Sequence, residues 1–412
     1  MMGSKGKIVI GKPTVIERGD RCRLQSEIIF RDTCYEIYYE YDSEYLEWLV
    51  DDRCDAFLLL MYGAALYEGA DVICEAPVTR QLYYQITSYL MPMMSKYIDE
   101  YHMLNIVADL APEVPSSHLE NTAALFSGGV DSFYTLLGRI ESGNAFNPIT
   151  HLVFNNLGAL TKDLQTSRLL FAEKVKKMEE IAQSFGVKLL AVDSNILEIS
   201  SQLPEVISSP DMYKNAGAVY GVKKLFGTCY WSSSGCGVSN LNVTLDDMAQ
   251  YDFFNTTLVS VRDLRFYLMD ITATRMDKVR FIADNDVVKA NLQVCHGDND
   301  SKCFKCSRTL AELYALGKLD EYNEVFDISW YKAHFYDRLG YTLGDKNEWD
   351  HGYCQETIET AKANGIPIPL RAWALAWLKW RPILFFKRTL KGSSILRRFY
   401  ERFDVRHKLN FE

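Results

Sequence analysis

The feature that most restricts the fold of this chain is an alternation of short apolar segments and longer helical segments that begins at Thr122. Four segments have the length and apolar character of buried strands: residues 122–126 (TAALF), 151–156 (HLVFNN), 187–195 (VKLLAVDSN) and 227–234 (GTCYWSSS). Helical patterns lie between them, at residues 133–143, 167–186 and 216–227. Short apolar strands separated by helices are typical of βαβ units, whose parallel sheet is covered on both faces. The pattern therefore predicts a doubly wound, Rossmann-like α/β domain, which binds ligands beyond the carboxyl ends of its strands.

The residues before and after this alternation have other patterns. A chain of 412 residues is longer than one hydrophobic core usually serves, so we expect two or three structural units. Residues 8–40 alternate like strands, and apolar helical patterns follow at 54–70 and 78–102. Prolines and serines then interrupt the pattern near residue 115. We predict an α+β domain at 1–118 for substrate or partner binding, the doubly wound domain at 119–325, and a helical region at 326–412.

The loop after the first predicted strand combines glycines, hydroxyls and one carboxylate. It contains Ser127, Gly128, Gly129, Asp131 and Ser132. A strand, a Ser/Gly-rich turn and a helix together present backbone N–H groups and the positive end of a helix dipole to an anion. A carboxylate beside bound phosphates is suited to hold Mg²⁺, which prefers oxygen ligands. The alternative is a helix N-terminus at which Ser and Asp only cap.

At SGGVDS the chain resembles the N-type ATP pyrophosphatases, also called the PP-loop or adenine nucleotide alpha hydrolase-like superfamily, whose signature is S-G-G-x-D-S. The resemblance implies ATP binding by the loop and attack of a substrate oxygen on the α-phosphate, which forms an adenylated intermediate. It also implies that adenine and ribose lie near the ends of the second and third strands. The implied nucleotide-binding residues are Phe126, Ser127, Gly128, Gly129, Val130, Asp131, Ser132, Phe154, Asn155, Asp193 and Ser194. The P-loop signature G-x-x-x-x-G-K-[ST] does not occur in the sequence.

A cysteine cluster follows the predicted sheet. Cys295, Cys303 and Cys306 form a C-x7-C-x2-C pattern, and C-x2-C commonly supplies half of a tetrahedral zinc site. The segments TRMDKV (274–279) and CFKCSRT (303–309) resemble a branch of the superfamily related to 7-cyano-7-deazaguanine synthase, which has a four-cysteine zinc site. Only three cysteines remain here, so the fourth ligand is Asp300, His296 or none. A metal-free remnant and an iron–sulfur or redox site are the alternatives.

Cations on these motifs suit the same chemistry. Adenylation builds negative charge on the α-phosphate and on the departing pyrophosphate, and positioned cations stabilise that charge. We predict this role for Arg275, Lys278 and Arg308, with Asp131 and Ser132 as the further catalytic residues and Asp131 as the magnesium ligand.

Charge is distributed unevenly along the chain. The net charge is −9, but residues 371–412 contain eleven Lys and Arg and only three Asp and Glu. The aromatic residues among these cations suggest helices packed on the protein itself, with nucleic acid or an anionic membrane surface as alternatives. The start of the sequence lacks the apolar core of a leader, and no apolar run reaches the length of a membrane span. We therefore expect a cytoplasmic protein without a transmembrane segment, with reduced cysteines.

These observations predict an ATP-dependent, AMP-forming C–N ligase that uses ATP, Mg²⁺ and Zn²⁺. A carboxylate or amide oxygen of a small-molecule or protein acyl substrate would be adenylated, and an amine or ammonia would displace AMP. One alternative is tRNA base modification or thiolation, for which the basic tail is the support. Another is an ATP-binding module in a bacterial defence or polysaccharide-locus assembly. We expect a homo-oligomer or a complex with proteins encoded by neighbouring genes.

Overall fold

A computed structural model describes residues 6–112, 118–141, 147–158, 160–161, 163–204, 207, 212–234, 243, 248–295, 298–345 and 351–392. The chain forms two compact units, Met1–Lys278 and Val279–Glu412. These units differ from the three predicted segments, whose boundaries lie at residues 118 and 325. The reason is that the sheet of the first unit contains strands from both sides of residue 118.

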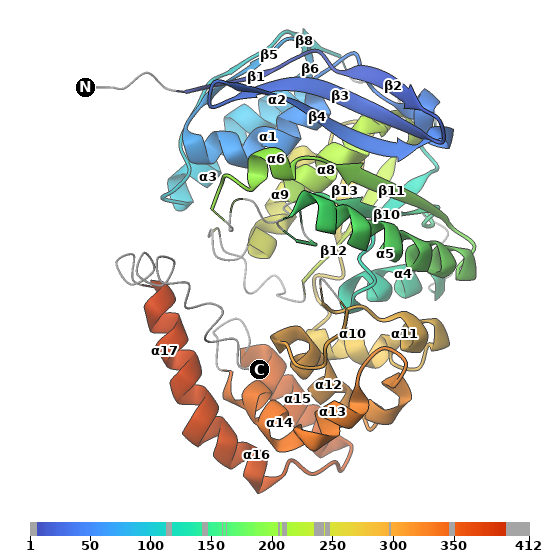
Figure 1. The fold of residues 1–412 in the computed structure, drawn as a ribbon, viewed down its shortest axis with the longest axis vertical. Coiled ribbons are helices and arrows are strands. Elements are labelled where there is room, and N and C mark those ends of the chain that lie inside the picture. Colours follow the sequence, from blue (N-terminus) through green and yellow to red (C-terminus); the bar gives the residue numbers. More distant parts are fainter. Residues whose placement is uncertain are drawn as a thin grey trace. The chain divides into compact units, whose positions relative to one another are not determined.

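Five parallel strands form one part of this sheet (Figure 1). In spatial order they are β13 (Arg265–Met269), β12 (Thr228–Ser232), β9 (Thr122–Leu125), β10 (His151–Asn156) and β11 (Lys188–Ser194). The four predicted strands are all present, and the α/β class with a mostly parallel sheet is confirmed. The fifth strand, β13, was not predicted, because RFYLM is short and has a charged first residue.

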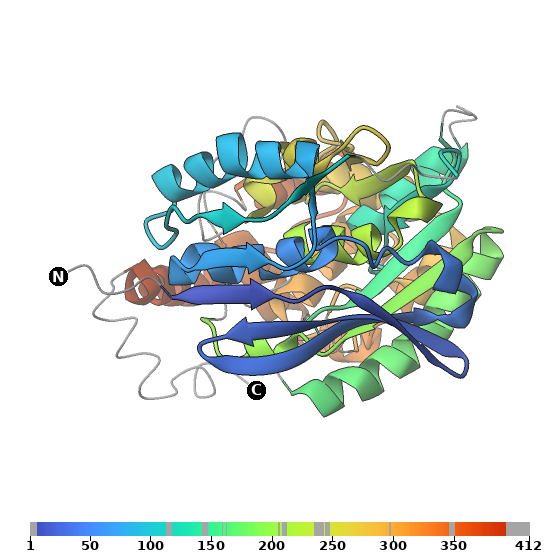
Figure 2. The same cartoon turned by 90° about the horizontal axis from the view of Figure 1, so that it is seen from above.

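The N-terminal strands extend the same sheet. They are β1 (Lys7–Ile10), β2 (Thr14–Arg18), β3 (Arg21–Phe30), β4 (Thr33–Asp42), β5 (Asp71–Cys74) and β7 (Ile106–Val107). β3 and β4 form the long blue hairpin of Figure 2, closed by Arg31 and Asp32 at positive φ. β4 pairs antiparallel with β11, so Glu40 lies opposite Asp193. This pairing makes the sheet mixed and joins the predicted N-terminal domain to the predicted doubly wound one.

Helices provide the apolar partners of the sheet. They are α1 (Asp55–Glu68), α4 (Val130–Glu141), α5 (Leu164–Ser184), α6 (Leu197–Ser200), α8 (Met212–Gly221) and α9 (Asp252–Val259), with short 3₁₀ helices η1 (Ser43–Trp48), η3 (Lys223–Leu225) and η5 (Met248–Tyr251). α1 is apolar on all sides and buried along most of its length. It packs closely on α8, where a Cβ on Gly217 would lie 2.3 Å from the Tyr39 hydroxyl and 2.6 Å from the Ala56 carbonyl. The main core of the first unit lies around this contact.

The helix predicted at 78–102 is interrupted. The structure has α2 (Arg80–Gln85), a π-helical segment η2 (Ile86–Leu90) and α3 (Met91–Tyr97), preceded by β6 (Val78–Thr79), which pairs with β8 (Leu110–Ala111). Pro92 lies in the first turn of α3. Because proline has no N–H to donate to the preceding turn, the helix changes its hydrogen-bond pattern there.

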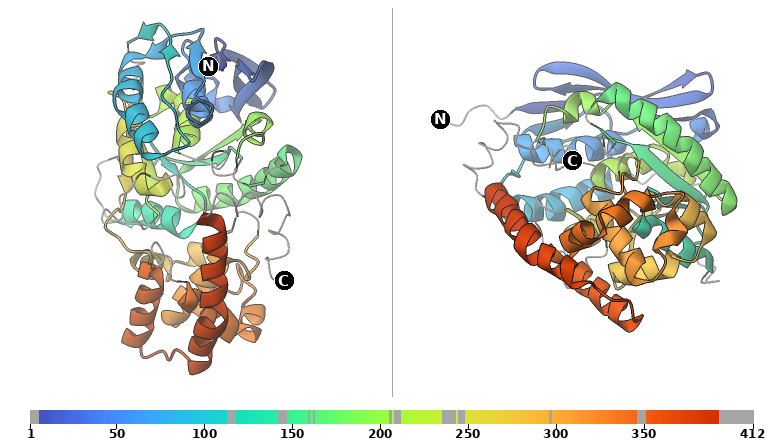
Figure 3. Two further views of the ribbon diagram at one scale, coloured as in Figure 1. Left: turned by 90° about the vertical axis from the view of Figure 1, so that its left-hand side faces the viewer. Right: turned by 60° about the horizontal axis from the view of Figure 1, so that its bottom comes forward.

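Where the structure describes the second unit, its regular secondary structure consists of helices (Figure 3). After α10 (Arg275–Ile282), which begins in the first unit, come α11 (Asp286–Asn291), α12 (Phe304–Ala315), η6 (Leu319–Tyr322), α13 (Ile328–Ala333), α14 (Phe335–Gly344), α15 (His351–Ala363), α16 (Leu370–Leu375), the π-helical η7 (Ala376–Trp380) and α17 (Arg381–Gly392). Its small core contains Ala311, Leu339, Leu343, Ala372 and Ala376. Among the described helices, none is both long enough and apolar enough to cross a membrane.

Candidate functional site

The predicted phosphate loop connects β9 to α4. Phe126 is buried and continues the strand pairing, since its N–H donates to the Val153 carbonyl at 2.9 Å. Gly128 has a φ of +73°, a conformation that L side chains rarely adopt, so a glycine is required where the chain turns. The Ser132 hydroxyl then donates to the Gly129 carbonyl at 3.0 Å, which steadies the first turn of α4. Ser127 is exposed between these anchored residues. The loop thus has the strand–turn–helix geometry of an anion site.

The position of the loop in the sheet is also informative. β9 pairs in parallel with β10 on one side and with β12 on the other. The strand order therefore reverses at β9, which is the topological switch point of this parallel region. In open α/β sheets, the crevice beyond the strand ends at such a point is where ligands bind.

Two buried cations contact the carboxylate of this loop. Arg275 Nη1 lies 3.2 Å from Asp131 Oδ2, and Lys278 Nζ lies 3.0 Å from Asp131 Oδ1. The side chain of Lys278 is fully buried and that of Arg275 is 5% exposed, whereas that of Asp131 is 29% exposed. The first turn of α10 thus brings together side chains separated by more than 140 residues in the sequence. Lys278 also donates to the carbonyl and the hydroxyl of Ser233, at 2.6 and 2.9 Å.

Two further residues of this site were not among the predicted site residues, although Ser233 lies in the predicted strand at 227–234. Ser233 follows β12 and Asp270 follows β13, so both lie at the carboxyl ends of the parallel strands. The Ser233 hydroxyl donates to the Asp270 carbonyl at 3.1 Å, and Thr135 of α4 donates to Asp270 Oδ2 at 2.9 Å. Asp270 has a φ of +59°. Recognising RFYLM as a strand would have placed Asp270 at this edge.

The candidate nucleotide residues on the neighbouring strands have protein partners. The ring of Phe154 is buried and stacks on that of Phe171. Asn155 Nδ2 donates to Asn215 Oδ1 at 2.9 Å, while its own Oδ1 is buried without a hydrogen bond. The Ser194 hydroxyl accepts the N–H of Ile196.

Asp193 is the most constrained member of this group. Its two carboxylate oxygens accept from Asn156 Nδ2 at 2.7 Å and from Arg168 Nε at 3.3 Å. Burial raises the pKa of Asp193, although these two partners oppose that change. Strand ends do carry these residues as predicted, but the side chains of Asp193 and Ser194 serve internal hydrogen bonds. A nucleotide bound at this position would therefore contact the backbone groups of these residues and not their side chains.

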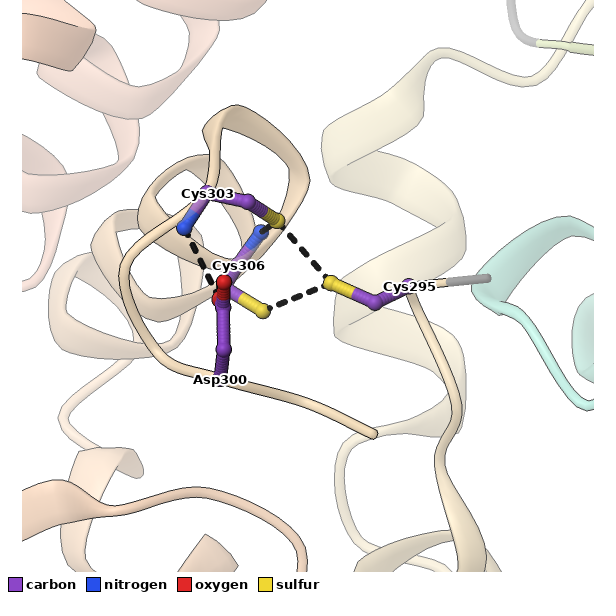
Figure 4. A group of neighbouring side chains, drawn as sticks. All are labelled: Cys295, Asp300, Cys303 and Cys306. Atoms are coloured by element: carbon purple, nitrogen blue, oxygen red, sulfur yellow. Dashed lines mark hydrogen bonds between the residues drawn. The ribbon is translucent and has the colours of Figure 1, made fainter. Parts of the chain in front are cut away.

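The three predicted cysteines of the second unit converge (Figure 4). Cys295 Sγ lies 2.9 Å from Cys303 Sγ and 3.0 Å from Cys306 Sγ. Asp300 completes the group, because its carboxylate oxygen and the three sulfurs all lie within 4.8 Å of one another. His296, the other predicted fourth ligand, lies outside the described residues.

The local chain geometry orients these four groups. Cys303 is the N-cap of α12, and its sulfur accepts the N–H of Cys306 at 3.4 Å. Asp300 Oδ1 accepts the N–H groups of Lys302 and Cys303, both at 2.8 Å. Hydrogen bonds from Cys295 and Cys306 lower the pKa of the Cys303 thiol, which favours a thiolate there. Three sulfurs and one carboxylate are a donor set that suits zinc.

Arg308, the third predicted catalytic cation, lies on α12 in the second unit. Its guanidinium carbon lies 4.6 Å from the ring centroid of Tyr353 and 5.2 Å from that of Phe304. Its Nε is 3.9 Å from Oε1 of Glu312, a residue with 1% exposure. These contacts place Arg308 in an aromatic setting within its own unit.

No protein-family model matches the chain, and no curated protein or solved structure matches it significantly. The two side-chain clusters and the strand topology are therefore the observations from which a function can be inferred.

Proposed function

We propose that this protein is an ATP-dependent, AMP-forming ligase of the N-type ATP pyrophosphatase kind. One observation carries the proposal: the SGGVDS loop leaves the strand at which the sheet order reverses, and its Asp131 is contacted by two buried cations. A phosphate-binding loop at a switch point suits a nucleotide, and buried cations suit a reaction that builds up negative charge.

Each residue then has a distinct task. Backbone N–H groups of Ser127 to Gly129 hold phosphate oxygens, because the positive φ of Gly128 turns the backbone toward the helix start. Arg275 and Lys278 stabilise negative charge at the α-phosphate and on the departing pyrophosphate. Asp131 would provide a carboxylate oxygen for Mg²⁺, and the positive charge of the ion would offset the negative charge of the phosphates. Phosphate oxygens bound at the loop would compete with Asp131 for Arg275 and Lys278, and carboxylate oxygens freed in this way would be available to hold Mg²⁺.

The reaction class follows the resemblance of SGGVDS, TRMDKV and CFKCSRT to the 7-cyano-7-deazaguanine synthase branch. A carboxylate or amide oxygen attacks the α-phosphate, the bond to pyrophosphate breaks, and an amine or ammonia later displaces AMP. The three cysteines with Asp300 are proposed as a structural zinc site of the second unit, because they leave no position on the ion for a substrate when all four bind.

Incubation with Mg²⁺-ATP and candidate carboxylate and amine substrates tests this proposal. Release of AMP and pyrophosphate is expected, and Asp131→Asn should reduce it by at least 100-fold, on the scale of losing a charge-stabilising group. Asp163→Asn is the matched control, since Asp163 caps α5 of the same unit and accepts the N–H of Thr166 at 2.8 Å. Products ADP and phosphate, or equal loss in both variants, would contradict the proposal.

A further inference from the structure

The last described helix of the second unit is apolar on two opposite faces. α16, η7 and α17 form a continuous helical segment from Leu370 to Gly392. One face is buried, at Ala372, Ala376, Trp380 and Leu384, and its α16 and η7 parts contact α14. Trp380 is a buried aromatic residue of this face, so the packing interpretation of the sequence agrees with the structure in part. Figure 1 and Figure 3 show that α17 extends beyond the other helices of its unit.

The opposite face is apolar and exposed. Its members are Leu370 (85% exposed), Trp377 (57%), Leu378 (82%), Phe385 (70%) and Phe386 (65%). Positions 370, 377/378 and 385/386 recur every seven or eight residues, so they form one stripe along the helix. A helix that needed only its own core would carry polar side chains here. We call these five residues the apolar stripe.

The charge of this helix differs from that of the remaining chain. Residues 370–392 contain six Lys and Arg and no Asp or Glu. The Arg381 guanidinium lies 3.4 Å from the ring centroid of Trp377, within the apolar stripe itself. Cations beside exposed Trp, Phe and Leu side chains are the combination found on helices that lie in the interface of an anionic bilayer.

Other binding partners would fit the apolar stripe less well than a lipid surface. Nucleic acid would require cations along the exposed stripe, but the stripe is made of Leu, Phe and Trp side chains, for which phosphates offer no apolar partner. A second copy of the same helix would bring two basic segments together, and like charges repel. Anionic lipid complements both properties, because its headgroups attract the cations and its acyl region accepts the apolar side chains.

We propose that the apolar stripe of α16–α17 binds the surface of an anionic lipid membrane, with the helix lying parallel to that surface. Leu378, Phe385 and Phe386 insert among the acyl chains, while the basic residues contact lipid phosphates. This inference does not depend on the ligase proposal, because it rests on a different part of the chain.

Flotation of the full-length protein with phosphatidylcholine vesicles, with and without 30% phosphatidylglycerol, tests the inference. We expect binding to the anionic vesicles, and at least a tenfold loss of partitioning for Phe385→Ser/Phe386→Ser. The matched control is Leu169→Ser, because Leu169 is an equally exposed apolar residue (74%) on α5 of the first unit. The substitutions change exposed side chains, so unchanged thermal unfolding should accompany the loss.

A charge variant separates the two contributions. Lys387→Gln/Lys391→Gln should weaken binding severalfold and reduce its dependence on salt, because the segment then carries two fewer positive charges. Four results would overturn the inference: no flotation with anionic vesicles, equal binding to neutral ones, an equal effect of Leu169→Ser, or full binding by the phenylalanine variant. Concentration-dependent dimerisation or RNA binding that the phenylalanine variant abolishes, without vesicle binding, would assign the stripe to those partners instead.

Discussion

Lys278 provides the sharpest test of how the candidate site is held together. We expect Lys278→Met to destabilise the first unit, because its ammonium group is buried and contacts both Asp131 and Ser233. For the 3.0 Å between Lys278 Nζ and Asp131 Oδ1, Coulomb's law gives an attraction of roughly 5–6 kcal/mol in a medium with a dielectric constant of about 20. Desolvation offsets part of this, and removing one partner of a buried pair usually costs about 3–5 kcal/mol. Because Asp131 keeps Arg275 as a partner, we expect a loss of about 2–3 kcal/mol in the free energy of unfolding.

A double-mutant cycle with Asp131→Asn isolates the pair. Asp131→Asn removes the carboxylate that contacts both Arg275 and Lys278, so the double variant should be more stable than the sum of the single effects predicts. We expect a coupling energy of at least about 1 kcal/mol from urea unfolding curves. Lys188→Met is the control, since Lys188 and Glu44 form an exposed pair at 3.3 Å that should contribute less than about 1 kcal/mol. A coupling energy below about 0.5 kcal/mol would refute the reasoning.

Three further predictions concern other parts of the chain. Gly217→Ala should lower the free energy of unfolding by about 1–3 kcal/mol, because its Cβ would overlap the Tyr39 hydroxyl. Thermal or urea unfolding measures this loss, and unchanged stability would show that α1 and α8 move apart without cost. Burial lowers the pKa of His151 to about 4, whereas the unfolded chain should have a value near 6.5. Because the unfolded state therefore binds a proton first as the pH falls, the free energy of unfolding should decrease by about 2–3 kcal/mol between pH 6.5 and pH 4. His151→Phe should flatten that part of the pH profile of stability measured by urea unfolding. Cys303→Ser should remove bound zinc measured by mass spectrometry, whereas Cys354→Ser should retain it, and equal zinc in both variants, or none in wild type, would contradict a zinc site.

The local parts of the fold were readable from the sequence because they depend on nearby residues. Strands β9 to β12 were predicted from short apolar runs, and the loop at Ser127–Asp131 from its glycines and hydroxyls. C-x2-C likewise places Cys303 and Cys306 on one helical turn, because residues three apart lie on the same face of a helix. The π-helical segment before Pro92 was missed although the proline was visible, because the helical pattern continues on both sides of it.

Pairing between distant segments was decided by the tertiary structure. No local pattern shows that β4 supplies an antiparallel partner for β11, and this pairing places the N-terminal strands in the main sheet. Sequence alone also could not reveal that Asp193 is held by Asn156 and Arg168, since that depends on which strand ends meet.

The sequence by itself determined the chemical groups available: a Ser/Gly-rich loop, a carboxylate, nearby cations and three thiols. Tertiary structure decided which of them meet. It brought Lys278 and Arg275 to Asp131, and Asp300 to the cysteines, while Arg308 packs between aromatic rings. The physical reason is that hydrogen-bond and charge contacts act over only a few ångströms. Residue types indicate the chemistry, but the chain topology sets the distances at which that chemistry can act.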